Sequence, residues 1–156
     1  MASLRSGALW NPVNENFFDE FVCTNRNNEL FNKVCSIRTA TNEDIESIYK
    51  VNNDSVRELC SSCYNEEDII PWIARLHPSM YKPFIDNGTM KVVALESEVV
   101  ACGRLEPFSD TTATVCCLYV SPSMSRKGIG RLLLQFLEKE AKVKGYKSEI
   151  TQYTPH

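Results

Sequence analysis

The chain has 156 residues, of which 43% are hydrophobic and 24% are charged, and this is the composition of one ordinary globular domain. Collagen-like, fully disordered and coiled-coil chains are excluded by these fractions. The net charge of −3 also excludes the surplus of Lys and Arg on which non-specific binding to nucleic acid depends, so we expect no nucleic-acid partner.

Seven cysteines are many for this length, but their number is odd and several of them lie in apolar runs. We expect buried thiols in a reducing compartment rather than a disulfide framework. Cys60 and Cys63 form an isolated C-x-x-C pair without the second pair that a zinc site needs, so no metal is expected. The N-terminus lacks the apolar core of a signal peptide, and no stretch has the ~20 apolar residues of a membrane helix. The prediction is a cytoplasmic protein with no membrane partner.

The first 34 residues differ from the rest, because they hold seven Asn and show no regular period. We interpret residues 1–34 as an Asn-rich N-terminal extension and residues 35–156 as the folded domain. Aromatic residues at 17–21 favour a short helix that docks on this domain.

From residue 35 onward, hydrophobic periodicity and turn residues mark out the elements in order. Thr41 and Asp44 have the spacing of a capping box at a helix start. The predicted elements are a strand at 35–38, a helix at 41–59, a helix from 65 to about 77, a short turn at 81–85, a hairpin of 90–95 and 99–105, a strand at 112–120, a helix at 129–144 and a strand at 148–153. This β-α-α-β-β-β-α-β order indicates an α/β or α+β fold with an antiparallel meander in its middle.

The strand at 112–120 runs into a loop with two glycines, Gly128 and Gly130, at the start of the clearest amphipathic helix. The first N–H groups of a helix have no partner inside it, and the helix dipole is positive there. Arg126, Lys127 and Arg131 add positive charge at the same point. The pattern suits a pyrophosphate, although it lacks both the Walker A and the dinucleotide-binding spacings. The alternative is a helix start whose glycines serve only turn geometry.

Three consecutive stretches resemble the acyl-CoA-binding motif of the GNAT superfamily of N-acetyltransferases. They are 118–122 (LYVSP), 126–130 (RKGIG) and 132–134 (LLL). The family motif is an R/Q-x-x-G-x-G/A loop after a strand that ends V-x-P, and here Ser125 stands at the R/Q position. Residues 37–41 with Asp44 resemble the opening strand and helix start of the family, and residues 55–59, Tyr64 and Trp72 resemble a bacterial-type subgroup. The resemblance covers about residues 35–150 and implies a mixed, mostly antiparallel sheet flanked by helices.

This resemblance implies acetyl-CoA as co-substrate and a small-molecule or peptide amine as acceptor, which attacks the thioester directly. The strand would meet the pantetheine arm, and the loop would hold the phosphates. The residues implied for the cofactor are Leu118, Tyr119, Val120, Ser125, Arg126, Lys127, Gly128, Ile129, Gly130 and Arg131.

The catalytic base is less well defined by the sequence. Glu106, just after the strand at 99–105, is the nearest acidic candidate and Asp110 is the next, while a solvated loop carboxylate with a water relay is the alternative. Family members continue through a further helix and two strands, so the resemblance implies a domain that is incomplete at its C-terminus. The open sheet edge would then offer a surface for a dimer. The rival interpretations are a degenerate acyl-CoA-binding or interaction protein and a truncated product without a stable fold.

Overall fold

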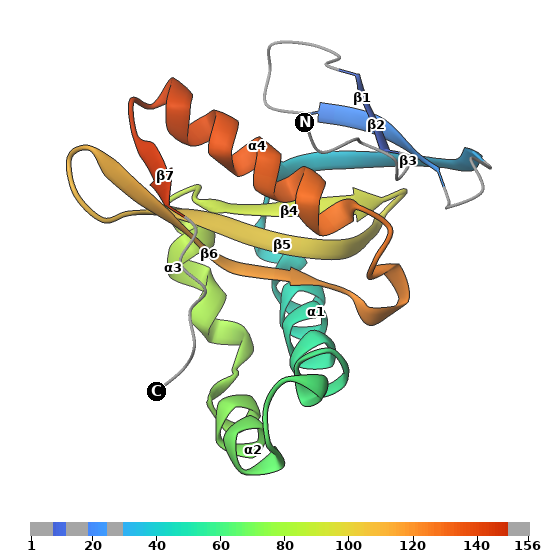
Figure 1. The fold of residues 1–156 in the computed structure, drawn as a ribbon, viewed down its shortest axis with the longest axis vertical. Helices are drawn as coiled ribbons and strands as arrows, with labels where there is room; N and C mark the ends of the chain where they lie inside the picture. Colours follow the sequence, from blue (N-terminus) through green and yellow to red (C-terminus); the bar gives the residue numbers. More distant parts are fainter. Residues whose placement is uncertain (1–7, 12–18, 25–29, 150–156) are drawn as a thin grey trace.

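A computed structural model describes residues 8–11, 19–24 and 30–149, with side chains for residues 35–147 (Figure 1). Within these residues, seven strands form one sheet in the order in which they follow along the chain. The strands are β1 (Ala8–Asn11), β2 (Asp19–Thr24), β3 (Leu30–Thr39), β4 (Met90–Leu95), β5 (Glu98–Pro107), β6 (Thr112–Val120) and β7 (Lys147–Glu149). Neighbouring strands are antiparallel except β6 and β7, which run parallel.

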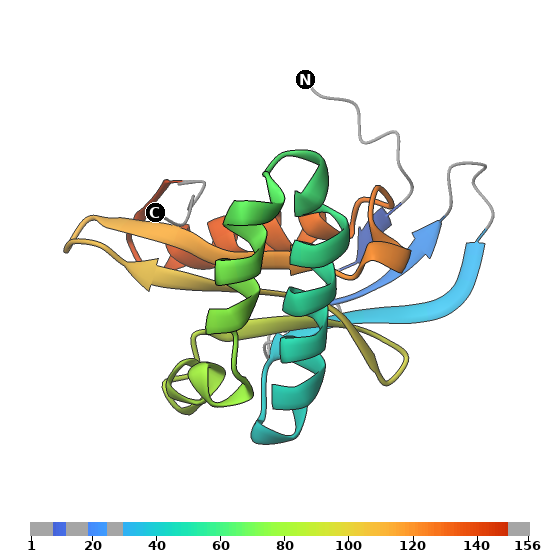
Figure 2. The same cartoon turned by 90° about the horizontal axis from the view of Figure 1, so that it is seen from below.

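Helices cover both faces of this sheet. They are η1 (Asn42–Asp44), α1 (Ile45–Glu58), η2 (Cys60–Ser62), α2 (Glu66–Arg75), η3 (Pro78–Tyr81), α3 (Lys82–Asp86), η4 (Pro122–Met124) and α4 (Ile129–Val143). Helix α4 lies on one face, and α1, α2 and α3 lie on the other (Figures 1 and 2). The predicted mixed, mostly antiparallel sheet flanked by helices is therefore confirmed. None of the helices in the described part of the chain is long and apolar enough to span a membrane.

The sheet extends further toward the N-terminus than the sequence pattern predicts. Strand β3 begins at Leu30, so the predicted division at residue 34 falls inside it, and the register places Phe21 of β2 opposite Cys35. The short helix expected at 17–21 is wrong from Asp19 onward, while residues 17 and 18 lie outside the described residues. Aromatic and β-branched residues at 21–24 favour a strand, and pairing with β3 satisfies their backbone groups. That residues 1–34 form a separate extension remains a prediction.

Two hydrophobic cores hold the layers together, one on each side of the sheet. The first lies under α4 and includes Ile129, Leu133 and Leu137, each at most 1% exposed. Their spacing of four residues puts them on one face of the helix, as the sequence predicts. The second core lies between the sheet and α1, η3 and α3. The central strand β4 is buried on both faces, and its sequence is accordingly apolar along almost its whole length.

The connection from β3 to α1 forms as predicted. The Asp44 carboxylate accepts a hydrogen bond from the backbone N–H of Thr41 at 2.8 Å, and Arg38 binds both of its oxygens at 2.7 and 2.8 Å. Burial by itself would raise the pKa of Asp44, but the hydrogen bonds from Arg38 and Thr41 lower it below its ordinary value. The ionised carboxylate thus stabilises the start of the first helix. The predicted last strand is described only as β7, and residues 150–153 lie outside the described residues.

Candidate active site

Strand β6 carries a bulge opposite β5. Cys102 pairs with Tyr119 and Arg104 pairs with Cys116, so Cys117 and Leu118 together oppose the single residue between them. Cys117 has a φ of 55°, a left-handed conformation that is uncommon for a residue with a side chain. The thiol of Cys102 donates a weak hydrogen bond, 3.7 Å long, to the carbonyl oxygen of Cys117. Since N–H and C=O of a trans peptide point in opposite directions, the N–H of Leu118 points away from Cys102.

The outer edge of β6 is paired over only part of its length. Strand β7 pairs with Thr112, Ala113 and Thr114. Beyond Thr114, no strand within the described residues pairs with this edge, which runs past the bulge to Val120. An open strand edge presents N–H and C=O groups that can pair with an extended ligand.

The start of α4 lies directly after this strand and the short helix η4. Its N-cap is Gly128, with a φ of 85°, and no side chain caps the helix; its first turn holds no acidic residue. The first N–H that bonds back into the helix is that of Leu132, to the Gly128 oxygen at 3.0 Å. The N–H groups of Ile129, Gly130 and Arg131 therefore have no partner inside the helix. An uncapped positive helix end of this kind fits an anionic phosphate group.

Gly130 links the helix start to the end of the strand. A Cβ on this residue would lie 3.1 Å from Cγ2 of Val120, which is closer than ordinary van der Waals contact. The glycine therefore lets the first turn of α4 pack against β6. The strand edge and the helix N-terminus become one continuous surface as a result.

The structure brings the predicted cofactor residues together at this junction. Leu118 and Val120 pack toward the core under α4, whereas Tyr119 packs on the opposite face with α1 and η3. In the loop, Arg126 and Arg131 are exposed and Ser125 is half-buried. The amino group of Lys127 lies 4.0 Å from the sulfur of Met124. These three positive residues flank Gly128, the N-cap of α4, along the chain.

The side chain of Glu106 reaches the residue that directly precedes Cys117 in the bulge. Its side chain is 50% exposed and binds Arg104 at 2.9 Å, and the thiol of Cys116 lies 3.4 Å from the same carboxylate oxygen. Its register partner is Thr114, three residues before Cys117, which corresponds to about 10 Å along a strand. Asp110 is exposed in the loop that follows β5.

A buried polar pair beside the bulge does not follow from the sequence pattern. Asn52 is 2% exposed and Tyr81 is 1% exposed, and the amide nitrogen of Asn52 donates to the Tyr81 hydroxyl at 2.6 Å. The amide oxygen of Asn52 has no hydrogen-bond partner within the described residues. Burial raises the pKa of Tyr81, and the nearby thiols of Cys102 and Cys117 raise it further. Helical spacing from Ile48 is the signal that places Asn52 on the buried face of α1.

A family comparison bears on this arrangement. The sequence profile described as the acetyltransferase (GNAT) family matches residues 46–154. The chain belongs to the GNAT acetyltransferase family. The match includes β6, the loop and α4, so the junction described above lies inside the family domain.

Solved structures share this GNAT fold. The PaiA N-acetyltransferase from Thermoplasma acidophilum, crystallised with coenzyme A, is 26% identical, with a TM-score of 0.63 over 71% of this chain and 74% of that one. Rv2747 from Mycobacterium tuberculosis, in complex with CoA, is 17% identical, with a TM-score of 0.55 over 73% of this chain and 62% of that one. The N-acetylglutamate synthase from Neisseria gonorrhoeae is 23% identical, with a TM-score of 0.53 over 72% of this chain but only 22% of its own. A comparison with curated protein sequences gives no match.

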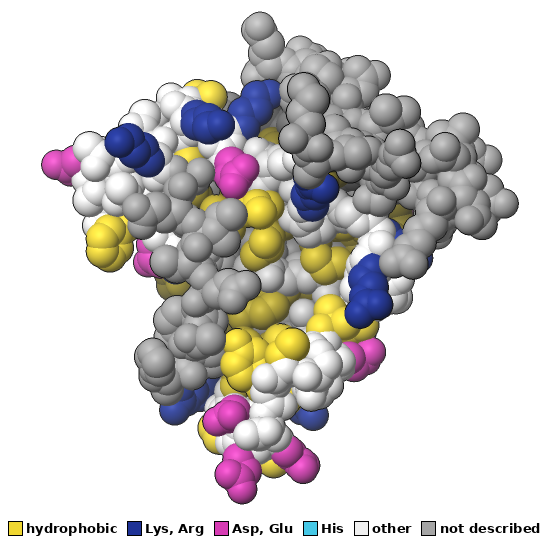
Figure 3. Space-filling view, viewed as in Figure 1, with side chains coloured by type: hydrophobic (Ala, Val, Ile, Leu, Met, Phe, Trp, Pro, Cys, Tyr) yellow, Lys and Arg dark blue, Asp and Glu magenta, His cyan; other side chains and the backbone are white. Residues whose placement is uncertain are grey.

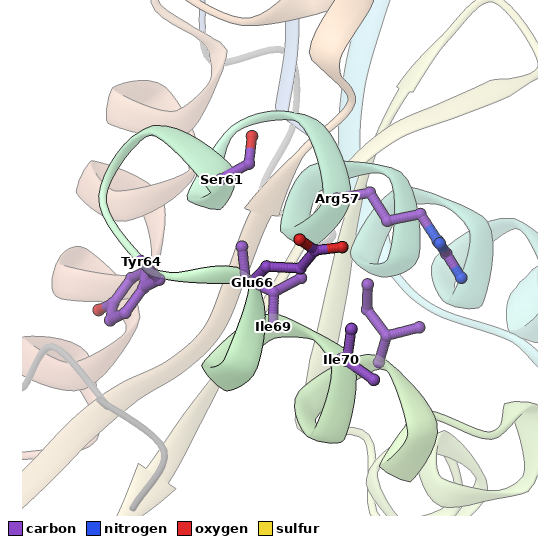
Figure 4. A pocket seen from close by; sticks show the side chains of 7 residues that line it. Arg57, Ser61, Tyr64, Glu66, Ile69 and Ile70 are labelled. Atoms are coloured by element: carbon purple, nitrogen blue, oxygen red, sulfur yellow. The ribbon is translucent and has the colours of Figure 1, made fainter.

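This GNAT domain also contains a pocket on the side of the sheet that α1, α2 and α3 cover. It lies between the C-terminal end of α1, η2 and α2, has a volume of about 400 Å³, and is shown in Figure 4. The residues that line it are Arg57, Ser61, Tyr64, Glu66, Ile69, Ile70 and Ile73. Figure 3 shows hydrophobic side chains in the middle of the face that lies between α4 and α2.

Proposed function

We propose that this GNAT domain transfers an acetyl group from acetyl-CoA to the primary amine of a small molecule or peptide. The observation that carries this proposal concerns the described residues: none of their side chains caps the N-terminus of α4, and none of their strands pairs with the neighbouring edge of β6 beyond Thr114. The helix N-terminus suits an anion, and the open strand edge suits an extended chain. Coenzyme A carries both groups, because it combines a diphosphate with a pantetheine arm. The coenzyme A in the PaiA structure supports the assignment.

Different residues of this chain would bind different parts of the cofactor. The edge of β6 at Leu118, Tyr119 and Val120 would pair with the pantetheine arm. The backbone N–H groups from Lys127 to Arg131, including those of Gly128, Ile129 and Gly130, would hold the diphosphate. The hydroxyl of Ser125 and the side chains of Arg126 and Arg131 would add a hydrogen bond and positive charge.

Acetyl-CoA supplies an activated thioester, so the protein's task is to align an amine with it and to stabilise the charge that develops. We assign the N–H of Leu118 as the donor to the thioester oxygen, because it points away from Cys102. A fixed backbone donor of this kind typically accelerates acyl transfer by about 10²-fold or more. Alignment of the amine and the thioester in one site supplies much of the remaining acceleration.

The attacking amine must lose a proton, and the departing thiolate takes up a proton from water, so that the products are the N-acetylated amine and the free thiol of coenzyme A. We assign Glu106 as the acceptor of the amine proton through water, because its half-exposed carboxylate lies 3.4 Å from the thiol of Cys116, which directly precedes Cys117 in the bulge. Arg104 fixes this carboxylate at 2.9 Å.

Thermal unfolding with and without acetyl-CoA tests the cofactor assignment, and product mass tests turnover. Product mass is preferable to a thiol reagent, because the chain's seven cysteines would also react with such a reagent. At 100 times its dissociation constant a ligand stabilises by about 2.7 kcal/mol, which corresponds to a rise of about 5–10 °C in Tm for this size of domain. No rise at millimolar acetyl-CoA would overturn the proposal. A rise without acetylation of any amine in a broad panel would instead identify an acyl-CoA-binding protein.

A further inference from the structure

Three thiols and two charged side chains lie around the bulge in β6. Cys102 of β5 is buried, whereas Cys116 and Cys117 are half-buried. The thiol of Cys116 donates to Glu106 at 3.4 Å, and the same carboxylate oxygen accepts a hydrogen bond from Arg104 at 2.9 Å. Both half-buried thiols lie along the part of β6 whose outer edge pairs with no strand within the described residues. A ligand that lies along this edge therefore meets nucleophilic groups.

Cys117 differs from the other two thiols in its backbone. Its φ is 55°, and it directly precedes Leu118, whose N–H we assign to the thioester oxygen. The sulfur of a cysteine and the backbone nitrogen of the next residue are only four bonds apart, so they lie about 3–4.5 Å from each other. In α/β-hydrolases the nucleophile also sits on a strained turn, and the N–H of the residue after it stabilises the oxyanion. The Cys117 sulfur thus lies where a nucleophile toward the bound thioester would lie.

Arg104 provides a buried cation beside this thiol. The residue is 8% exposed, and its Cζ lies 3.8 Å from the centre of the Phe84 ring. Its Nε has no hydrogen-bond partner within the described residues. Burial raises the pKa of Cys117, and the guanidinium of Arg104 opposes this effect. Negative charge that develops on the Cys117 sulfur is therefore stabilised by a cation that the fold already holds in place.

The other two thiols lack this combination. Cys102 is 0% exposed and contacts the carbonyl oxygen of Cys117, so a ligand cannot reach it. Cys116 is held by its hydrogen bond to Glu106, and burial together with that bond raises its pKa to about 11. Cys117 is the thiol that both lies at the open edge and precedes the assigned N–H donor.

We infer that Cys117 is a second acceptor of the acyl group, and that its sulfur attacks the thioester of bound acetyl-CoA when no amine is present. A bond forms between this sulfur and the acetyl carbon, and the bond from that carbon to the coenzyme sulfur breaks. The proton of the Cys117 thiol passes through water to the departing thiolate, so the products are S-acetyl-Cys117 and free coenzyme A.

The step exchanges one thioester and one thiol for another thioester and thiol, so it is reversible and needs no further reactant. The domain would therefore also exchange acetyl groups between acetyl-CoA and free coenzyme A. This inference rests on the proposed function, since acetyl-CoA must first bind along β6.

Mass analysis of tryptic peptides, after incubation with acetyl-CoA in an amine-free buffer, tests the inference. Residues 105–126 form one peptide, which holds Cys116 and Cys117, and residues 58–75 form another, which holds the exposed Cys63. Acetylation of peptide 58–75 measures the chemical background. We expect peptide 105–126 to gain one acetyl group at least tenfold faster, and neutral hydroxylamine to remove this group, as it removes thioesters.

Two variants with a matched control locate the acetyl group. Cys117→Ala removes the thiol, and Cys117→Gly removes it and also suits the left-handed backbone. Both are expected to lower acetylation of peptide 105–126 at least tenfold, whereas Cys116→Ala keeps it within twofold. Transfer of acetyl from acetyl-CoA to isotopically labelled coenzyme A should fall by the same factor in both Cys117 variants. Thermal unfolding of each variant checks that it is folded.

Equal acetylation of the two peptides, or acetylation of peptide 105–126 that persists in both Cys117 variants, would overturn the inference. The acetyl-CoA thermal shift of the wild-type protein is measured in parallel. A normal shift without acetylation at Cys117 rejects the inference alone. If millimolar acetyl-CoA causes no shift, the acetyltransferase proposal fails and the inference fails with it.

Discussion

The thiol of Cys102 lies 3.7 Å from the carbonyl oxygen of Cys117, and this contact joins β5 to the bulge in β6. Cys102 is fully buried, and burial keeps it as a thiol by raising its pKa. The contact orients the peptide between Cys117 and Leu118 at the point where the strand leaves regular pairing. The bulge therefore depends on a side chain of the neighbouring strand as well as on its own backbone.

Cys102→Ala is expected to lower the stability by about 1–2 kcal/mol and the acetyl-transfer rate at least tenfold, because it leaves a small cavity and frees the Leu118 peptide. Cys102→Ser retains a donor and should keep more of the rate. Cys35→Ala, at a fully buried position in the other core, is the control and should lower stability alone. Denaturant unfolding and initial rates measure the two effects. Equal rates for Cys102→Ala and Cys35→Ala would contradict the assigned role of the bulge.

The glycines around α4 give a second prediction. Gly130→Val is expected to weaken acetyl-CoA binding at least tenfold, because its side chain would press on Val120 and displace the helix start. Gly128→Ala strains a left-handed residue, which costs about 1 kcal/mol, and should also weaken binding. Gly145→Ala is the control, since Gly145 has a φ of 84° but lies at the other end of α4. Gly145→Ala should lose as much stability as Gly128→Ala but keep the acetyl-CoA affinity of the wild type. Titration calorimetry measures the affinity.

Most of the fold is predictable from residues 35 onward, because local signals agree with the tertiary structure. The predicted strand at 112–120 matches β6 as described, and the helix predicted from Ile129 begins at that residue. Its apolar face and the glycine at its N-cap point to the same boundary. The sequence pattern did not predict the N-terminal strands because pairing between strands decides their conformation: β1 pairs with β2, and β2 pairs with β3.

The candidate site is predictable where the chemistry is local and not where it depends on register. The amides without a partner inside the helix at the start of α4, to which we assign the diphosphate, follow directly from the loop and helix sequence. The bulge at Cys117 comes from a one-residue mismatch with β5, which no pattern within β6 reveals. The contact between the Glu106 carboxylate and the thiol of Cys116 likewise depends on the register of β5 and β6. The Asn52–Tyr81 pair joins residues 29 positions apart, so only the folded structure identifies it.

The Asn52–Tyr81 pair should behave as a coupled unit. Tyr81→Phe is expected to destabilise the protein by about 1–3 kcal/mol, because it leaves the buried Asn52 amide without its one partner. The double variant Asn52→Leu/Tyr81→Phe should cost at least about 0.5 kcal/mol less than the sum of the single variants. A double-mutant cycle by urea unfolding measures this coupling. Additive effects would show that the hydrogen bond contributes nothing to stability.

Asp44 should make stability depend on acidic pH. Its pKa in the folded state lies below the ordinary value, so it adds stability above about pH 4, and this contribution is lost as the pH falls through the folded pKa. Asp44→Asn is expected to cost about 2 kcal/mol at pH 7, with a smaller difference from wild type below pH 4. The control Asp86→Asn removes an exposed ion pair with Lys82 and should cost less than about 0.5 kcal/mol. A difference between wild type and Asp44→Asn that stays constant from pH 7 to pH 3 would contradict this account.

A crystal structure with coenzyme A tests the central claim most directly, because that claim concerns which atoms hold the diphosphate. We predict diphosphate oxygens within about 2.7–3.2 Å of the backbone nitrogens at the start of α4, with the pantetheine arm along β6 beyond Thr114. A coenzyme bound elsewhere, with the N–H groups of Gly128, Ile129 and Gly130 facing only solvent, would contradict the account.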